Sequence, residues 1–194
     1  RDEADDSVLN MAGLNKEDDI FAPIIQSTKR RTIWLGANLI TAILAAAAIG
    51  VFEATIEKVV TLAILMPIVA SMGGIAGMQS LALVMRFQAT NQIGATNSKL
   101  LIFKEASIGV LNGLLWSSIV ASAVYFWFNS IFLGLVIAAA LMINLIIGAI
   151  SGVSLPLILR RLNIDPALAG GVILTTITDI VGFISLLGIA TLMM

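Results

Sequence analysis

The sequence contains no cysteine and no histidine. Without cysteine there are no disulfide bonds, thiolate metal ligands or cysteine nucleophiles. Without histidine there are no imidazole metal ligands, no triads that depend on histidine, and no proton transfer by imidazole near neutral pH. The side-chain metal ligands that remain are mainly hard oxygens, with methionine thioethers as the soft alternative.

Charged residues are also few. They make up 12% of the 194 residues, against about 25% in average soluble domains, whereas 59% are hydrophobic and the mean hydropathy is +1.02. This composition predicts an all-α integral membrane protein whose surroundings are the lipid bilayer. The formal net charge is −1, and we expect no nucleic-acid partner.

Motifs of common enzymes are missing as well. The sequence has no GxSxG elbow and no HExxH pair, and the glycine-rich run from Gly73 to Ser80 lacks the lysine of a phosphate-binding loop. We therefore expect a protein that is not an enzyme.

Five apolar runs account for most of the chain. About 20 apolar residues suffice for a helix to span a bilayer, and the predicted helices cover approximately residues 32–52, 59–85, 101–128, 131–159 and 166–194.

The basic residues indicate the orientation of these helices in the membrane, because cytoplasmic helix ends carry an excess of lysine and arginine. A cytoplasmic N-terminus places eight basic residues inside and only Lys58 outside, so we expect the N-terminus inside, the C-terminus outside and a location in the cell membrane. The eight are Lys29, Arg30, Arg31, Arg86, Lys99, Lys104, Arg160 and Arg161.

Residues 1–31 differ from the predicted transmembrane domain, residues 32–194, because seven of the twelve acidic residues lie between positions 2 and 19. Two interpretations stay open: a solvated leader, or a cytoplasmic helix that docks below a pore and whose acids sense a cation. The first residue is arginine rather than methionine, so we expect a piece of a longer chain.

The second apolar run is rich in residues that weaken a helix. Pro67 removes a backbone hydrogen bond, and Gly73, Gly74 and Gly77 follow within a few turns. We predict a kinked or locally unwound helix that lines an aqueous path, since irregular backbone at membrane depth must be buried in protein or face water. Close helix packing is the alternative explanation for the glycines.

The last run contains Asp179. An ionised aspartate at the bilayer centre costs about 2.5–3.5 kcal/mol on insertion scales, and such residues usually face the bundle interior or a water-filled path. Spacings of four, four and three place Gly171, Thr175, Asp179 and Gly182 on one helix face, and Thr178 adds a hydroxyl nearby. We interpret this run as a pore-lining helix; a hydrogen-bonded acid that fixes helix packing is the alternative.

Asp165 and Pro166 stand directly before this run. Aspartate is favoured as a helix N-cap and proline at the first helical position. We therefore predict that Asp165 is a cap rather than a cation ligand.

We expect the ion site to be shared between two chains, since one membrane-embedded carboxylate is too little for a fixed metal site. Twofold dimers are the commonest oligomers, and a homodimer would bring two copies of Asp179 to a central pore on its axis. Mg²⁺ keeps several waters and binds through one or two carboxylates. This argument favours hydrated Mg²⁺ but does not separate it from Mn²⁺ or Co²⁺.

Methionines raise a soft-metal alternative, because thioethers select Cu(I). Met66, Met72, Met78 and Met85 are separated by six, six and seven residues, which scatters them around a helix. Ordinary packing is therefore favoured.

Several motifs occur together: Met66-Pro67-Ile68-Val69, the run from Gly73 to Ser80, Asp165-Pro166-Ala167-Leu168, the run from Thr175 to Asp179, and the run from Asn38 to Ala42. Their combination resembles the transmembrane domain of the MgtE family of magnesium channels and transporters. The resemblance covers essentially the whole chain, and the acidic N-terminal stretch is similar to that family's connecting plug helix.

The resemblance implies a homodimeric, Mg²⁺-selective channel of five helices per chain, whose second and fifth helices line the pore. It implies that Asp179 and Thr175 hold the ion. It also implies cytosolic domains upstream that bind Mg²⁺ as a regulator and are not part of this sequence. The further pore-lining residues are Gly171, Thr178, Gly182, Gly73, Gly74, Gly77 and Met78.

The sequence departs from the family pattern at Ile75 and Met78, where members often carry polar residues. The loss of these side-chain oxygens predicts either a drier neck of the pore or a relaxed ion selectivity.

A rival transport function is an exchanger that couples Mg²⁺, Mn²⁺ or Co²⁺ to Na⁺ or H⁺. A rival without transport is a membrane anchor or assembly subunit.

Overall fold

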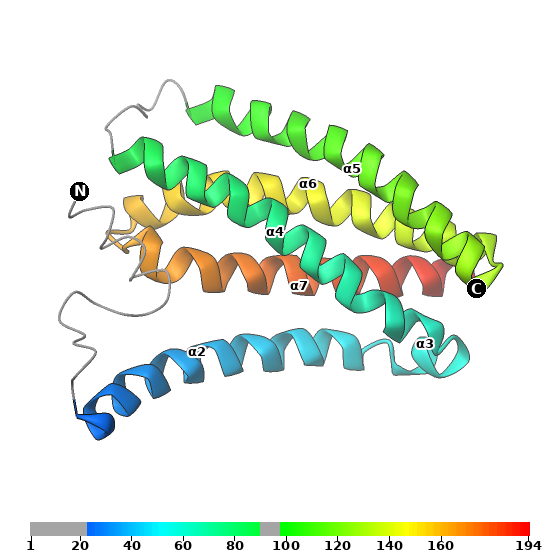
Figure 1. The fold of residues 1–194 in the computed structure, drawn as a ribbon, viewed down its shortest axis with the longest axis horizontal. Helices are drawn as coiled ribbons and strands as arrows, with labels where there is room; N and C mark the ends of the chain where they lie inside the picture. Colours follow the sequence, from blue (N-terminus) through cyan, green and yellow to red (C-terminus); the bar gives the residue numbers. More distant parts are fainter. Residues whose placement is uncertain (1–22, 90–97) are drawn as a thin grey trace.

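The computed structural model describes residues 23–89 and 98–194, in which every regular element is a helix (Figure 1). The helices are α2 (Ile24–Gly50), α3 (Glu53–Lys58), α4 (Thr61–Ala89), α5 (Ser98–Phe128), α6 (Ile131–Arg161) and α7 (Pro166–Met193). The predicted acidic plug-like segment lies largely outside the described residues. Its last residues belong to α2, which begins at Ile24 and continues without a break past position 32.

Five of these helices are long and apolar enough to cross a membrane. The candidate spans are Ser27–Gly50, Thr61–Gln88, Ser98–Phe128, Ile131–Arg161 and Pro166–Met193. Each overlaps one predicted span, so the predicted all-helical fold is confirmed, with five helices whose length and composition allow them to cross a membrane.

The helix α6 lies at the centre of the bundle. It packs against α4, α5 and α7, whereas α2 packs mainly against α7 and leaves much of its surface exposed (Figure 1). The largest group of buried apolar side chains joins α4, α6 and α7, and includes Leu62, Leu65, Val69, Ile137, Leu141, Leu186 and Leu187.

Two short connections have clear causes in the sequence. Between α5 and α6, Asn129 has a positive φ of 49°, and the Ser130 hydroxyl accepts a hydrogen bond from the Leu133 N–H at 3.3 Å. Before α7, an Asp165 carboxylate oxygen accepts from the Ala167 N–H at 2.9 Å, and Pro166 is the first helical residue. The predicted cap is therefore confirmed.

The helix α4 is continuous from Thr61 to Ala89 with Pro67 inside it, so local unwinding, one of the two forms predicted for this run, does not occur. A proline costs a helix one internal hydrogen bond, which a helix held by its neighbours tolerates. Its glycines instead allow close contact with α6. A Cβ at Gly148 of α6 would lie 2.5 Å from the Gly73 carbonyl oxygen, and one at Gly77 would lie 3.0 Å from the Gly148 carbonyl oxygen.

Two predicted connections differ in detail. The charged stretch that was predicted to be a short connection after the first span forms the helix α3. The polar stretch 86–100 was predicted to be a loop, with a partly helical stretch as the alternative. The helix α4 extends to Ala89 and α5 begins at Ser98, so both described ends of the stretch are helical. In α3, Glu53, Ala54, Glu57 and Lys58 are residue types that favour a helix.

A second membrane-embedded carboxylate corrects the prediction that Asp179 is alone. Glu105 lies within the third span, is 5% exposed, and accepts a hydrogen bond of 2.7 Å from the Ser80 hydroxyl on α4. Glu105 was not singled out from the sequence, in which the neighbouring Lys104 was assigned to the cytoplasmic end of this span. Within the bundle, Lys104 is exposed while Glu105 is buried.

Candidate functional site

A cavity of about 610 Å³ lies along α4 and α7 and contains Asp179. The α4 residues recur at intervals of three and four, so they form one helix face. From α7, Thr175 and Asp179 face the same space one turn apart. The cavity is lined by Ala70, Ser71, Gly74, Ile75, Met78, Gln79, Ala82, Thr175 and Asp179.

Asp179 is partly exposed to this cavity. The neighbouring hydroxyls of α7 bond to backbone carbonyls of their own helix, and among the described residues no hydrogen bond to the Asp179 carboxylate is formed. Within the described part of the chain, Asp179 thus lines the cavity without a hydrogen bond to another helix.

Thr175 adds oxygen to the same wall. Its hydroxyl donates to the Gly171 carbonyl at 2.9 Å, which leaves the lone pairs of the hydroxyl oxygen available to an ion's water. Gly171 lies one turn further along, where a Cβ would be 4.0 Å from the Met78 sulfur. Met78 itself lines the cavity on the α4 side.

Four other predicted pore residues lie at helix contacts within the chain. Thr178 is 0% exposed and bonds to the carbonyls of Leu174 and Thr175 at 3.1 Å each. The other three are glycines that approach neighbouring side chains: Gly73 and Gly182 approach Asn144, and Gly77 approaches Leu174. Of the predicted set, Asp179, Thr175, Gly74 and Met78 line the cavity, Thr178 and these three glycines lie at helix contacts, and Gly171 belongs to neither group.

Methionines do not gather at one site. Met66 is buried in the apolar core, whereas Met78 lines the cavity. In residues 23–89 and 98–194 no group of three or more histidine, cysteine, aspartate or glutamate side chains could hold a metal ion.

Asn144 on α6 was missed by the sequence reasoning. It is 0% exposed, and its Nδ2 donates to the Val69 carbonyl of α4 at 2.7 Å. A single asparagine inside a long apolar run does not reveal which neighbouring helix it contacts, so the sequence gives only the signal that a polar group is buried.

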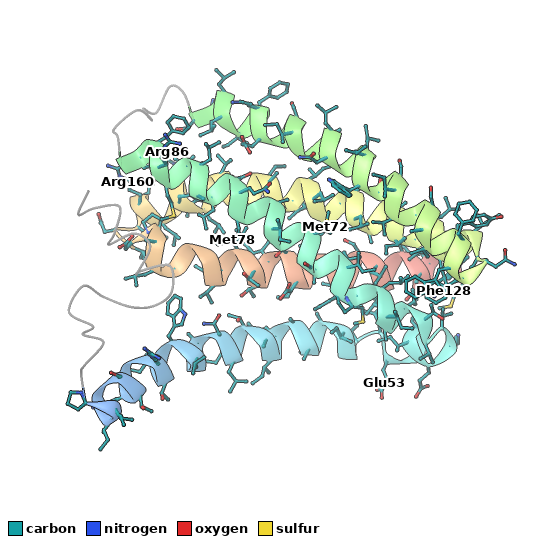
Figure 2. All side chains as sticks on the ribbon, viewed as in Figure 1. Glu53, Met72, Met78, Arg86, Phe128 and Arg160 are labelled. Atoms are coloured by element: carbon teal, nitrogen blue, oxygen red, sulfur yellow. The ribbon has the colours of Figure 1, made fainter. Side chains whose placement is uncertain are left out.

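The two ends of the bundle differ in charge. Arg86 and Arg160 lie at one end, and Glu53 and Phe128 lie at the other (Figure 2). The basic end has a polar hollow of about 470 Å³ between the last turns of α4 and α6 and the first turn of α7. Its lining residues are Met85, Gln88, Arg160, Asn163, Ile164, Asp165, Pro166 and Ala167.

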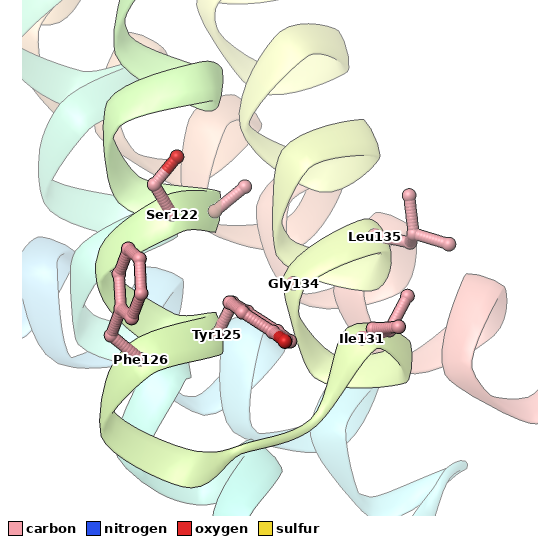
Figure 3. Close-up of a pocket in the computed structure, with 7 residues that line it drawn as sticks. Ser122, Tyr125, Phe126, Ile131, Gly134 and Leu135 are labelled. Carbon is pink, nitrogen blue, oxygen red and sulfur yellow. The ribbon is translucent and has the colours of Figure 1, made fainter.

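The opposite end has an apolar hollow of about 420 Å³ between α5 and α6 (Figure 3). Tyr125 and Phe126 line it from α5, and Ile131 and Leu135 line it from α6. It contains no carboxylate. In the polar hollow, the Asp165 carboxylate caps α7. The cavity between α4 and α7, which contains Asp179, is therefore the candidate site for an ion.

The fold and this cavity define the class of protein: a multi-pass helical membrane protein with a carboxylate exposed in a cavity between two of its spans. The model of the MgtE family, described as divalent cation transporter, matches residues 66–189. This chain belongs to the MgtE family, and it is a multi-pass protein of the cell membrane.

Three relatives are each named magnesium transporter MgtE. The one from Bacillus subtilis (strain 168) is 34% identical over 189 residues, which cover 97% of this chain and 42% of that protein. The one from Thermus thermophilus is 30% identical over 164 residues, covering 84% of this chain and 36% of the relative. The one from Enterococcus faecalis is 28% identical over 193 residues, covering 100% and 42%. The chain spans less than half the length of each relative.

Proposed function

We propose that this chain is a pore-forming transmembrane domain that conducts hydrated Mg²⁺, with Asp179 as the central ion-binding residue. The observation that carries the proposal is the position of Asp179, partly exposed in a cavity between two membrane-spanning helices. The names of the relatives and the family's description as divalent cation transporter support Mg²⁺ as the substrate.

The chemistry of the cavity fits an ion that keeps its waters. Mg²⁺ dehydrates reluctantly and binds through one or two carboxylates. Asp179 supplies negative charge, and the Thr175 and Ser71 hydroxyls and the Gln79 amide supply groups that can bond to the ion's waters. Direct coordination by several protein oxygens is not needed.

The active unit in this proposal is a homodimer. One chain offers a single carboxylate to the cavity, and a second copy related by a twofold axis would present another to the same path. The exposed face of α4 around Ile75 would then meet its partner across the axis. The ion would interact with two Asp179 side chains.

Positive residues near the helix ends support an orientation with the start of α2 in the cytoplasm. Arg86, Arg160 and Arg161 lie near the ends of α4 and α6 on that side, and Lys58 ends α3 on the other. Cytoplasmic ends carry the excess of basic residues. Regulatory domains upstream, with Mg²⁺ as their effector, belong to the same proposal.

The proposal is tested with the purified chain in liposomes that contain a Mg²⁺-sensitive dye. We expect Mg²⁺ influx for the native chain and at least about a tenfold loss for Asp179→Asn, because the substitution removes the charge while preserving the volume. Asp165→Asn is the matched control. Asparagine caps a helix as well as aspartate does, so its influx should stay unchanged.

The same liposomes separate a channel from the rival exchanger. A channel carries Mg²⁺ down its gradient without a second ion, whereas an exchanger would require Na⁺ or H⁺ on the opposite side of the membrane. The outcome that would contradict the role of Asp179 is separate: equal influx by the native chain and by Asp179→Asn would remove Asp179 from the mechanism. A strict dependence on a second ion would reject the channel.

A further inference from the structure

Asn144 occupies a niche directly behind the candidate ion site. Its amide bonds to the Val69 carbonyl through Nδ2 at 2.7 Å, while its Oδ1 is the one buried side-chain oxygen or nitrogen of residues 23–89 and 98–194 without a hydrogen-bond partner. A buried acceptor without a donor destabilises a fold. A polar group in such a position requires an explanation.

Two glycines from different helices form the niche. A Cβ at Gly182 of α7 would lie 2.8 Å from Asn144 Nδ2, and a Cβ at Gly73 of α4 would overlap the amide group. The side chain of Asn144 therefore lies between α4 and α7 and contacts both. No larger residue fits at either glycine while Asn144 holds its position.

The niche adjoins the cavity on both helices. On α4, Gly73 immediately precedes Gly74, which lines the cavity. On α7, Gly182 follows the cavity residue Asp179 by three positions and so lies less than one helical turn away. The contacts of Asn144 with α4 and α7 therefore lie within about one helical turn of Asp179, where its carboxylate lines the cavity.

We propose that Asn144 is a positioning residue that sets the separation of α4 and α7 at Asp179, and thereby the preference of the site for Mg²⁺ over a larger divalent cation. The inference rests on the proposed function. Asp179 attracts any divalent cation by charge, whereas the spacing of the walls determines which hydrated ion fits. Mg²⁺ requires oxygens at about 2.0–2.1 Å in octahedral geometry, and Ca²⁺ accepts about 2.3–2.6 Å in flexible geometry.

A packing role predicts something different. Leucine has nearly the shape of asparagine and no unpaired oxygen, so packing alone would tolerate or favour it at this buried position. If the hydrogen bond from Asn144 to the Val69 carbonyl fixes the position of α4, leucine preserves the fold but lets α4 move relative to α7. Asn144→Leu therefore separates the two roles.

The experiment measures Mg²⁺ and Ca²⁺ influx into liposomes that contain the native chain or Asn144→Leu, each normalised to the amount that elutes as folded protein in size-exclusion chromatography. We expect the ratio of Mg²⁺ to Ca²⁺ influx to fall by about twofold to tenfold, the factor that the net free energy of one hydrogen bond represents. A general loss of active protein would scale both fluxes equally and leave the ratio unchanged.

Asn112→Leu is the matched control, because Asn112 is exposed on α5 and is not part of the cavity lining. Asn144→Ala is the second variant, which removes the same donor without adding volume, and we expect the same direction of change. An unchanged ratio in the folded Asn144 variants would overturn the inference. So would failure of both variants to fold, since Asn144 would then be required for the fold.

Failure of the proposed function gives a different result from failure of this inference. If the native chain and Asn112→Leu carry no Mg²⁺, the proposed function is wrong. If both carry Mg²⁺ and the Asn144 variants keep the native ratio, only the role of Asn144 is wrong.

Discussion

Polar and apolar side chains both line the cavity. Asp179 and Thr175 of α7 and Ser71 and Gln79 of α4 are polar, whereas Ile75 and Met78 of α4 provide apolar surface, and Ile75 is 54% exposed. Apolar constrictions oppose the passage of a hydrated ion, because they offer no hydrogen bonds to its waters. Under the proposed function, the apolar surface of Ile75 and Met78 should therefore limit the rate of transport, and Asp179 should determine the charge of the ion.

Replacing Ile75 by asparagine should raise the rate of Mg²⁺ influx. The amide would bond to the ion's waters at the apolar wall, and one such bond corresponds to about a twofold to tenfold change. Dye influx in liposomes measures the rate, and Ile75→Val is the control that keeps the wall apolar. Slower influx for Ile75→Asn than for Ile75→Val would contradict the role given to this wall.

Single residues differ in how well the sequence reveals them. Asp179 is predictable, because an acid in an apolar run must be explained by solvent, a partner or an ion. Asn144 and Glu105 are not predictable in the same way, since their roles depend on which helix lies beside α6 or α5. Hydrophobic periodicity does not determine neighbours in space.

The crossing of α4 and α6 depends on small residues. Gly73 and Gly77 of α4 meet Gly148 and Gly152 of α6, so backbone atoms of the two helices approach directly. Close approach of this kind replaces the hydrophobic effect as a source of helix association in lipid. The wall of the cavity on α4 is supported from behind by this contact.

Gly148→Ala should destabilise the folded protein by about 1–3 kcal/mol, the usual effect of overpacking, because the new Cβ would lie 2.5 Å from the Gly73 carbonyl oxygen. Gly36→Ala on α2 is the control, since a Cβ there meets nothing within 4 Å. Alanine favours a helix over glycine, so the control should match or exceed native stability. Thermal unfolding in detergent compares the variants, and equal midpoints would argue against the tight α4–α6 contact.

The hydrogen bond between Ser80 and Glu105 joins α4 to α5 within the membrane-spanning region. Ser80→Ala should lower the free energy of unfolding by about 1–3 kcal/mol, because it leaves a buried carboxyl group without its donor. Glu105→Gln should have a smaller effect, since the amide oxygen still accepts from Ser80. A double-mutant cycle of Ser80→Ala and Glu105→Ala measures the coupling; strictly additive losses would show that the two side chains act independently.

Whole helices were predicted more reliably than their interiors. Five apolar runs predict five spans, because length and hydropathy alone determine which segments can cross a bilayer. The second run predicted a kinked or locally unwound helix from Pro67 and its glycines; α4 is continuous, so it is not unwound. Its glycines allow close packing against α6. A glycine that gives the backbone conformational freedom and a glycine that lets a neighbouring helix approach look the same in the sequence.

At the scale of the molecule, one chain presents its cavity on an open side. Among the described residues, those that line the cavity come from α4 and α7, and Ile75 on its α4 side is 54% exposed. The proposed homodimer would close this side with an identical surface. That proposal places residues of the α4 wall near their own copies at the twofold axis.

The absence of cysteine allows a direct test of this arrangement. A single Ser71→Cys substitution introduces a thiol into the cavity wall, and a short bifunctional thiol reagent should link two chains in membranes. Phe126→Cys on the exposed side of α5 is the control and should remain unlinked. Dimers are counted by denaturing gel electrophoresis; efficient linking through position 126 and none through position 71 would place the interface on another face.

The position of α2 has a mechanical consequence. Its principal helix contact is with α7, the helix that bears Asp179, and its first turn follows whatever chain lies before Ile24. Under the proposed function, a displacement of the start of α2 would reach α7, the helix that bears Asp179, through this direct contact between the two helices.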